Sequence, residues 1–231
     1  MANADALSVI LAARYGSAGE SALLDPPVRN ALRVTVRGRA CVAKLLGYAV
    51  GPGAEAYNRR LSDGFAMETY TYARLSRWPV TLVDAFSAQA GHVVVTTEYK
   101  GRPWGTYEPS EKSDRTVARR LIRQLRAVHR AGVAHGDLIL QNILFRPPCG
   151  VAIIDFEKSQ RSSPEATSWD YRTLVEALLW PRNTRGVAFC VLRALPTELA
   201  KRTFASAIGN MADNANAHLD AARRECRERR R

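Results

Sequence analysis

The chain has 231 residues, of which 46% are hydrophobic and 24% charged, and its formal net charge is +12. This composition is that of a globular protein, long enough for one large domain or for two lobes that share a core. No run reaches the roughly 18 apolar residues that a membrane span needs. The N-terminus lacks the basic region of a signal peptide. We therefore expect a globular chain with no membrane span.

The cysteines are scattered and form no C-x-x-C pair, so neither disulfides nor a structural zinc site is expected. Reduced thiols indicate the cytoplasm, with the nucleus as an alternative. The four are Cys41, Cys149, Cys190 and Cys226.

Basic residues concentrate in Arg115–Arg130 and in the tail Arg223–Arg231. A positive surface favours polyanionic partners, so an acidic protein or a nucleic acid is a candidate. A solvated helix face followed by a frayed tail is the alternative interpretation.

The first hundred residues contain several short runs of β-branched and apolar residues, which predict strands. Gly38 lies between two such runs and favours a β-hairpin. The segment Phe65–Leu75 has apolar residues at near-helical spacing and predicts one helix. The predicted strands are Leu7–Ala12, Ala31–Val36, Ala40–Leu46, Val80–Phe86 and His92–Tyr99.

The character of the chain changes after Gly101. Arg115–Arg130 has an apolar stripe opposite its arginines and predicts an amphipathic helix, which Gly132 ends. Trp169–Trp180 and Gly186–Met211 also favour helix. The sequence thus predicts an α+β fold in one domain, with a β-rich lobe over residues 1–100 and a helical lobe over residues 101–231.

Two motifs lie in the predicted helical lobe, a short distance after the boundary between the two lobes. HGDLILQN supplies Asp137 and Asn142 in a loop, and VAIIDFEKS places Asp155 at the end of an apolar run. Phosphoryl transfer needs a carboxylate for the acceptor hydroxyl and hard oxygen ligands for Mg²⁺. It also needs a lysine on the phosphates and an acid that holds this lysine.

These motifs resemble those of the protein-kinase superfamily. HGDLILQN matches the catalytic loop H-x-D-L-x-x-x-N, and IIDFE stands where the family has D-F-G. The resemblance implies a bilobal kinase-like fold and a small, atypical member of the superfamily. By position, it implies that Lys44 in CVAKLL binds phosphate and that Glu68 in the following helix pairs with Lys44.

The resemblance also implies ATP and Mg²⁺ as cofactors. Asp137, Asn142 and Lys44 would be catalytic, and the metal ligands would be Asn142 and Asp155, with Glu157 as a further candidate. Thr96–Gly101 would be the hinge for adenine. The nucleotide-binding set would be Lys44, Glu68, Glu98 and Tyr99, with Gly16 and Gly19 in an incomplete glycine loop.

The departures from the family pattern bear on the substrate. Gly136 replaces an arginine, Ile139 replaces the loop lysine of serine/threonine kinases, and Glu157 replaces the glycine of D-F-G. D-F-E also resembles the choline-kinase and aminoglycoside-phosphotransferase branches. About fifteen residues separate Asp155 from Asp170, which resembles the residue that braces the catalytic loop. The usual peptide-binding platform is therefore missing or minimal.

Several functions fit these residues. An ATP- and Mg²⁺-dependent phosphotransferase is favoured, with a protein Ser/Thr acceptor ahead of a small molecule of the choline or aminoglycoside type. A nucleotide-binding pseudokinase scaffold is the alternative that the poor glycine loop and Ile139 favour. A nucleic-acid-binding protein is the third hypothesis, but no base-reading motif supports it.

Overall fold

We describe the protein from a computed structural model. The structure describes residues 2–16, 22–23, 30–75, 78–99, 101, 104 and 107–210. Gly19, Cys226 and the basic tail Arg223–Arg231 lie outside the described residues.

The N-terminal lobe is built on one antiparallel sheet with the strand order β1-β2-β3-β5-β4. The central strand β3 pairs with β2 on one side and with β5 on the other, so Lys44 faces Ala31 and Val94. The strands are β1 (Ala22–Leu23), β2 (Ala31–Val36), β3 (Arg39–Gly47), β4 (Leu82–Ala88) and β5 (Gly91–Thr97).

The predicted hairpin between β2 and β3 is confirmed. Its two-residue loop is Arg37-Gly38, and both residues have positive φ angles, 50° and 74°. This is the conformation of the two-residue turn whose twist matches that of paired strands. The hairpin fixes the register that places Lys44 on β3.

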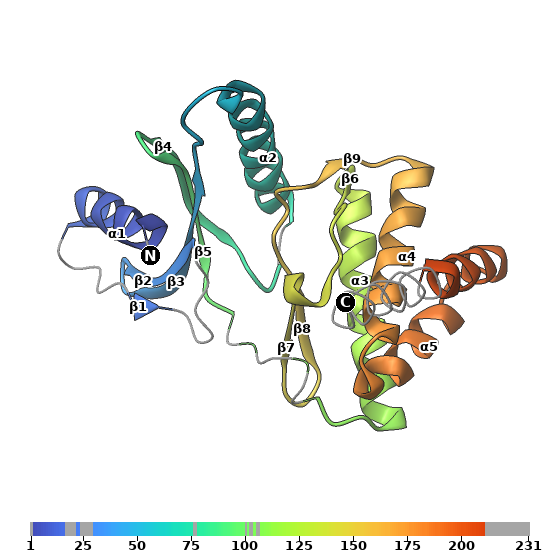
Figure 1. The fold of residues 1–231 in the computed structure, drawn as a ribbon. Helices are drawn as coiled ribbons and strands as arrows, with labels where there is room; N and C mark the ends of the chain where they lie inside the picture. The colour runs from blue at the N-terminus through green and yellow to red at the C-terminus, as the bar shows by residue number, and fades with distance from the viewer. Residues whose placement is uncertain are drawn as a thin grey trace, which may run out of the picture.

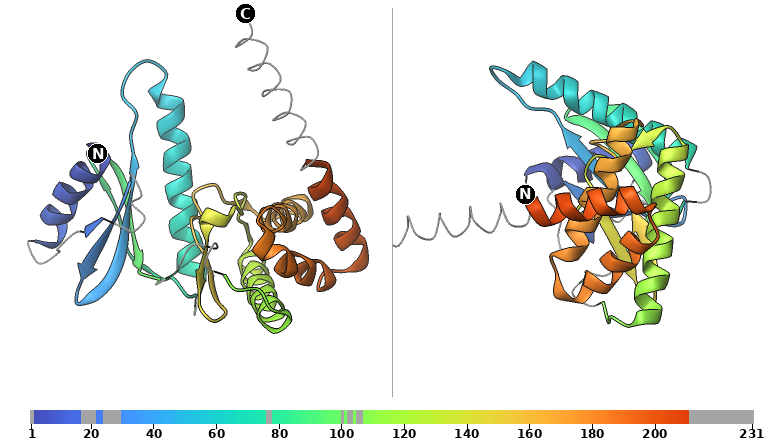
Figure 2. Two further views of the ribbon diagram at one scale, coloured as in Figure 1. Left: turned by 60° about the horizontal axis from the view of Figure 1, so that its bottom comes forward. Right: turned by 90° about the vertical axis from the view of Figure 1, so that its right-hand side faces the viewer.

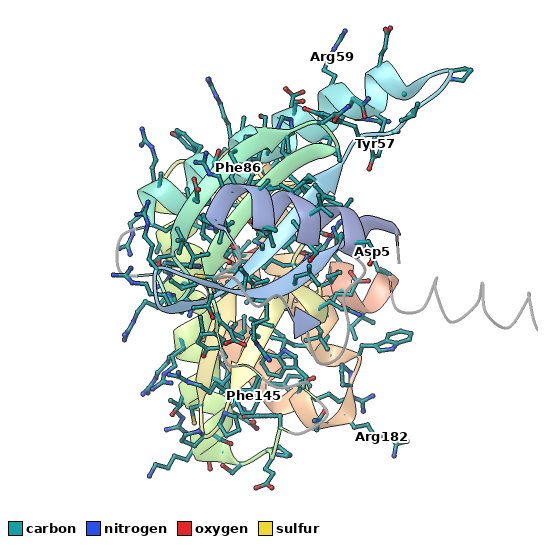
Figure 3. All side chains as sticks on the ribbon, turned by 90° about the vertical axis from the view of Figure 1, so that its left-hand side faces the viewer. Asp5, Tyr57, Arg59, Phe86, Phe145 and Arg182 are labelled. Atoms are coloured by element: carbon teal, nitrogen blue, oxygen red, sulfur yellow. The ribbon has the colours of Figure 1, made fainter. Side chains whose placement is uncertain are left out.

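The prediction of a strand at Leu7–Ala12 is wrong, because this segment lies inside the helix α1 (Ala2–Tyr15). Leu7 and Leu11 are one helical turn apart and pack on the sheet residues Val34, Val36 and Cys41. Figure 3 shows α1 lying across this outer face of the sheet. A short apolar run does not by itself separate a strand from a buried helix face.

The second helix of this lobe, α2 (Ala54–Arg74), is longer than the predicted segment Phe65–Leu75. It begins after Gly53, which has a φ of 81°. Figures 1 and 2 show α2 standing between the sheet and the C-terminal lobe. The side chain of Glu68 is buried on this helix, on the side of the site.

The C-terminal lobe is mainly helical, as predicted, and Figure 1 shows its helices together on the far side of α2 from the sheet. It also has two small antiparallel pairs, β6 with β9 and β7 with β8. A further helix covers residues 197–210. The labelled elements are α3 (Glu111–Arg130), β6 (Val133–Ala134), η2 (Leu140–Asn142), β7 (Ile143–Arg146), β8 (Gly150–Ile153), β9 (Gln160–Arg161), α4 (Pro164–Leu179), η3 (Arg182–Thr184) and α5 (Arg185–Arg193).

Local signals explain where these helices begin and end. Ser110 caps α3 through a capping box with Ser113, and Gly132 follows its end with a φ of 80°. Ser163 caps α4 and Pro164 is its first residue. The Ser163–Glu165 segment, the nearest sequence echo of the kinase A-P-E motif, therefore starts a helix.

The largest hydrophobic cluster lies in the C-terminal lobe and extends to the end of α2 through Tyr72 and Leu75. This continuity joins the two lobes, in agreement with an α+β bilobal kinase-like fold. Cys41, Cys149 and Cys190 are free thiols. Among the described helices, none combines the length and apolar character that a bilayer span requires.

Candidate active site

The loop with the HGDLILQN motif is held from below by Asp170 of α4. The Asp170 carboxylate accepts hydrogen bonds from the backbone N–H of His135 at 2.7 Å and from that of Gly136 at 2.8 Å. Asp170 is fully buried, and His129 Nε2 lies 2.9 Å from the same carboxylate. The predicted bracing contact is confirmed, and it fixes the backbone directly before Asp137.

His135 supports the loop from inside. It is fully buried, and its Nε2 lies 2.9 Å from the carbonyl oxygen of Ile154. Burial lowers the pKa of His135, so the neutral imidazole is favoured at this position. The ring also packs against Phe156 of the D-F-E motif. His135 therefore ties the loop to the strand end that carries Asp155.

Asp137 and Asn142 face each other across the loop. Asn142 Nδ2 donates to the backbone carbonyl of Asp137 at 2.9 Å and to its Oδ2 at 3.3 Å. Because the amide nitrogen is engaged in this way, the side-chain oxygen is the atom that Asn142 would offer to the predicted metal ion. The single turn η2 positions Asn142 at the start of β7.

Three carboxylates surround the ammonium of Lys44. Lys44 Nζ donates to Asp155 Oδ1 at 2.5 Å and to Glu157 Oε2 at 2.8 Å. It lies 3.8 Å from Glu68 Oε2, an atom that makes no hydrogen bond within the described residues. The structure thus brings all four predicted residues together, with Glu157 closer to Lys44 than Glu68 is.

The charges of this cluster shift the pKa values of its members. Burial raises the pKa of Glu68 to about 7, with Asp155 and Glu157 adding to the effect and Lys44 opposing it. Burial alone would lower the pKa of Lys44, but attraction by the three carboxylates outweighs it and raises that pKa. Lys44 therefore stays charged, whereas Glu68 titrates near neutral pH.

The backbone after Asp155 runs close to two glycines, and a side chain at either position would clash with it. A Cβ atom on Gly64 of α2 would lie 2.7 Å from the carbonyl oxygen of Glu157. A Cβ atom on Gly136 would lie 2.5 Å from the carbonyl oxygen of Lys158. Gly136 also has a φ of 79°, which favours glycine. These contacts account for a glycine at the position where the family has an arginine.

Lys158 is a site residue that the sequence analysis missed. Its Nζ donates to Asp137 Oδ2 at 2.9 Å, from a side chain that is 67% exposed. The available signal was a lysine directly after D-F-E in a chain that has Ile139 in place of the loop lysine. That signal is weak without the fold, because 21 positions separate Lys158 from Asp137.

The predicted hinge Thr96–Gly101 includes Lys100, which lies outside the described residues; its other residues lie at the end of β5 and directly after it. The Glu98 N–H donates to the Ala40 carbonyl at 2.9 Å, and its partly buried carboxylate accepts from Arg33 Nε at 2.7 Å. The ring of Tyr99 lies under the guanidinium of Arg146. Gly16 has a different setting from the predicted one. It ends α1, where its N–H donates to the Ala12 carbonyl at 2.9 Å.

The donor set of the predicted metal site fits Mg²⁺ in its chemistry. Asp155 offers a carboxylate and Asn142 an amide oxygen, which are hard ligands, and Mg²⁺ usually takes its remaining ligands from phosphates and water. Asp155 has a φ of 66°, an unusual conformation that aspartate tolerates better than most residues. Within the described part of the chain, no three His, Cys, Asp or Glu side chains form a metal-holding group by themselves.

A pocket of about 390 Å³ adjoins these residues on the side of α2. Figure 3 labels Tyr57 and Arg59 near the end of α2 that projects beyond the sheet. The pocket is lined by Tyr57, Arg60, Leu61, Glu157 and Lys158. Two neighbouring lining residues thus reach the site, Glu157 at Lys44 and Lys158 at Asp137.

The bilobal fold, the braced loop and the lysine–carboxylate cluster define a kinase-like protein. The model of the lipopolysaccharide kinase (Kdo/WaaP) family matches residues 99–179, which include the loop and the D-F-E motif. Curated relatives include mitogen-activated protein kinases. That family match and these relatives support the assignment of the chain as a kinase-like protein.

The relatives are distant and the matches are partial. The mitogen-activated protein kinase mpkC of Aspergillus oryzae is 28% identical over 125 residues, covering 49% of this chain and 36% of the relative. The mitogen-activated protein kinase HOG1 of Wallemia muriae is 29% identical over 94 residues, covering 39% of this chain and 34% of the relative. The chain thus spans about a third of the length of these curated relatives.

Proposed function

We propose that the protein is an ATP- and Mg²⁺-dependent phosphotransferase that transfers the γ-phosphoryl group of ATP to an alcohol. The observation that carries this proposal is the pairing of two clusters. Asp137 and Asn142 lie in a loop braced by Asp170, and Lys44 contacts Asp155, two residues after β8. A carboxylate for the acceptor and a cation for the phosphates are the parts that phosphoryl transfer requires.

In this reaction the acceptor oxygen forms a bond to the γ-phosphorus while the bond to the β–γ bridging oxygen breaks. The bridging oxygen leaves with the electron pair as part of ADP, and Asp137 takes the acceptor proton. Lys44 steadies the ATP phosphates. Asp155 and Asn142 would hold Mg²⁺, which neutralises charge on the phosphates when bound.

A protein Ser/Thr hydroxyl is the first candidate acceptor, and relatives named mitogen-activated protein kinases support a protein acceptor. A non-protein acceptor is the second candidate. One observation favours it: only six residues, 158–163, lie between the D-F-E motif and the start of α4, and two of them form β9, so little chain is available to bind a peptide. The matching family model is named for lipopolysaccharide kinases, which agrees with this second candidate.

Three predictions accompany the proposed activity. Residues 1–231 form a single kinase-like domain, with lobes at 1–100 and 101–231. The protein works in the cytoplasm, with the nucleus as the alternative. The third is that the basic surface contacts an acidic protein or a nucleic acid. The arginines of α3 are exposed, which supports this prediction. Two of them already have partners within the protein, since Arg115 pairs with Glu111 and Arg120 donates to the Cys149 carbonyl.

The decisive experiment incubates the purified protein with γ-labelled ATP and Mg²⁺, with and without cell extract. Label on a protein supports the first acceptor class, and label on a small molecule or glycan supports the second. The variant Asp137→Asn is the control that ties the label to this site. Nucleotide binding without transfer to any acceptor would favour the pseudokinase scaffold instead.

A further inference from the structure

An ammonium group lies at Asp137 although the loop itself carries no lysine. Ile139 occupies the position of the loop lysine, and its N–H donates to the Asp137 carbonyl at 2.9 Å. The side chain of Ile139 is 43% exposed, so it is not part of the core. The cation at Asp137 comes instead from Lys158, which follows the D-F-E motif.

We propose that Lys158 replaces the missing loop lysine and neutralises the transferred phosphoryl group. This inference rests on the proposed phosphotransferase function, since it assigns a residue to the same reaction. When ATP and the acceptor are bound, the Lys158 ammonium moves from Asp137 to an oxygen of the γ-phosphoryl group. Asp137 is thereby released to take the acceptor proton.

Close contacts before and after Lys158 fix the position of its backbone, so its side chain starts from a defined point. The carbonyl oxygen of Lys158 approaches Gly136 so closely that no side chain fits there, and Glu157 contacts Gly64 in the same way. Ser159 follows, with its N–H donating to the Phe156 carbonyl at 3.0 Å and its hydroxyl to the same oxygen. The next residues form β9, which pairs with β6 directly before the loop.

The ammonium itself is free to move. The Lys158 side chain is 67% exposed and the Asp137 side chain 22% exposed, so the pair is open to solvent on the lysine side. Ion pairs at such solvent-accessible positions are worth only about 0–1 kcal/mol. Leaving Asp137 therefore costs little when a more highly charged phosphoryl group is close. Electrostatic stabilisation of charge that develops in the transition state is usually a large contribution to catalysis.

The pocket next to the site agrees with this role. Lys158 contacts Asp137 and also lines the pocket with Tyr57 and Arg60 of α2. An acceptor that enters through this pocket would bring its hydroxyl past Lys158 to Asp137. The Lys158 ammonium would then lie on the side from which the acceptor approaches. A cation that neutralises the transferred phosphoryl group must lie there.

The test compares Lys158→Met with Lys201→Met. Lys201 is the matched control because its side chain is 68% exposed and also forms one ion pair, with Glu198 in the helix 197–210. Phosphate release from Mg²⁺–ATP, with water as the acceptor, is the rate measured. We expect Lys158→Met to lower kcat about 10²-fold with KM for ATP nearly unchanged, and Lys201→Met to leave both unchanged.

Rescue from the loop separates a chemical role from a structural one. The double variant Lys158→Met with Ile139→Lys returns an ammonium to the loop position, so we expect it to recover about tenfold or more of the lost rate. A lysine that only supported the fold would not be replaced in this way. Unchanged kcat in Lys158→Met, or no recovery in the double variant, overturns the proposal.

A measurement of nucleotide binding tests the role of Lys158 independently of enzymatic activity. Titration calorimetry gives the affinities of ADP alone and of ADP with aluminium fluoride, which mimics the transferred phosphoryl group. We expect Lys158→Met to keep the ADP affinity and to weaken the aluminium fluoride complex about tenfold or more. If the parent protein transfers no phosphate to water or to any acceptor, the proposed function fails. Equal affinities of the parent and Lys158→Met for the aluminium fluoride complex overturn the role of Lys158.

Discussion

Glu157 Oε2 accepts a hydrogen bond from Lys44 Nζ at 2.8 Å, across 113 positions of the sequence. This contact gives a physical reason for a glutamate in place of the D-F-G glycine. The carboxylate holds the lysine, while the Glu157 backbone lies against Gly64 of α2. Because Glu68 lies 3.8 Å from Lys44, the lysine depends on the D-F-E motif at least as much as on α2.

The first prediction concerns the acceptor proton. Asp137→Asn should lose about 10²–10⁴-fold in phosphoryl transfer, because the amide cannot take the proton. The substitution keeps the size of the side chain, so we expect the Kd for ATP to stay unchanged. Transfer of label from γ-labelled ATP and calorimetric titration with ATP measure the two quantities. Transfer at the parent rate would show that Asp137 has another role.

The second prediction concerns the metal. Asp155→Ala removes the carboxylate that we assign to Mg²⁺, so ATP should bind this variant equally well with and without Mg²⁺. Titration of ATP in Mg²⁺ and in a chelator measures the difference for the parent and for the variant. Asp155 also accepts from Lys44, so the affinity measured in the chelator serves as the control for that contact. A variant that keeps the full effect of Mg²⁺ contradicts the assignment.

The third prediction ranks the two glutamates at Lys44, Glu157 and Glu68. Glu157→Gln should lower kcat/KM for ATP more than Glu68→Gln does, because of these two glutamates Glu157 alone is within hydrogen-bonding distance of the Lys44 ammonium. A hydrogen bond to a charged group is worth about 1.5–3 kcal/mol, and partial exposure of Glu157 reduces this, so we expect roughly a tenfold loss. Steady-state kinetics on both variants provide the comparison. A larger loss in Glu68→Gln would reverse the ranking.

The fourth prediction is a pH dependence of stability that Glu68 causes. The pKa of Glu68 is about 7 in the folded protein against 4.5 as the reference. The folded state thus binds more protons than the unfolded state between these values, so its stability falls as pH rises through this range. The contribution is up to about 3 kcal/mol. Urea unfolding across this range should show a smaller fall for Glu68→Gln, and parallel curves would rule out this assignment.

The fifth prediction tests the close approach at α2. Gly64→Ala places a Cβ atom 2.7 Å from the Glu157 carbonyl oxygen, so the D-F-E segment must shift and both stability and transfer should fall. Gly209 is the matched control, because it is also helical and an added Cβ atom there meets nothing within 4 Å. Gly209→Ala should stabilise the protein by about 0.4–1 kcal/mol. Thermal unfolding measures both, and equal shifts in the two variants would contradict the steric account.

The sequence by itself determined the parts of the protein whose signals are local. The turn Arg37-Gly38, the apolar stripe of α3 and the order of Asp137, Asn142 and Asp155 all follow from neighbouring residues. Each of these signals depends on residues that are close together in the sequence. They therefore predicted the hairpin, the helix and the kinase-like resemblance. The structure agrees with each of these elements.

Only the tertiary structure decided how distant residues meet. The apolar residues of Leu7–Ala12 fit a strand as well as one face of a helix. In the structure the segment is helical and packs on the sheet. The contacts of Glu157 with Lys44 and of Lys158 with Asp137 join segments that are far apart in sequence. They arise because Gly64 and Gly136 let two backbones approach closely, which no periodic pattern encodes.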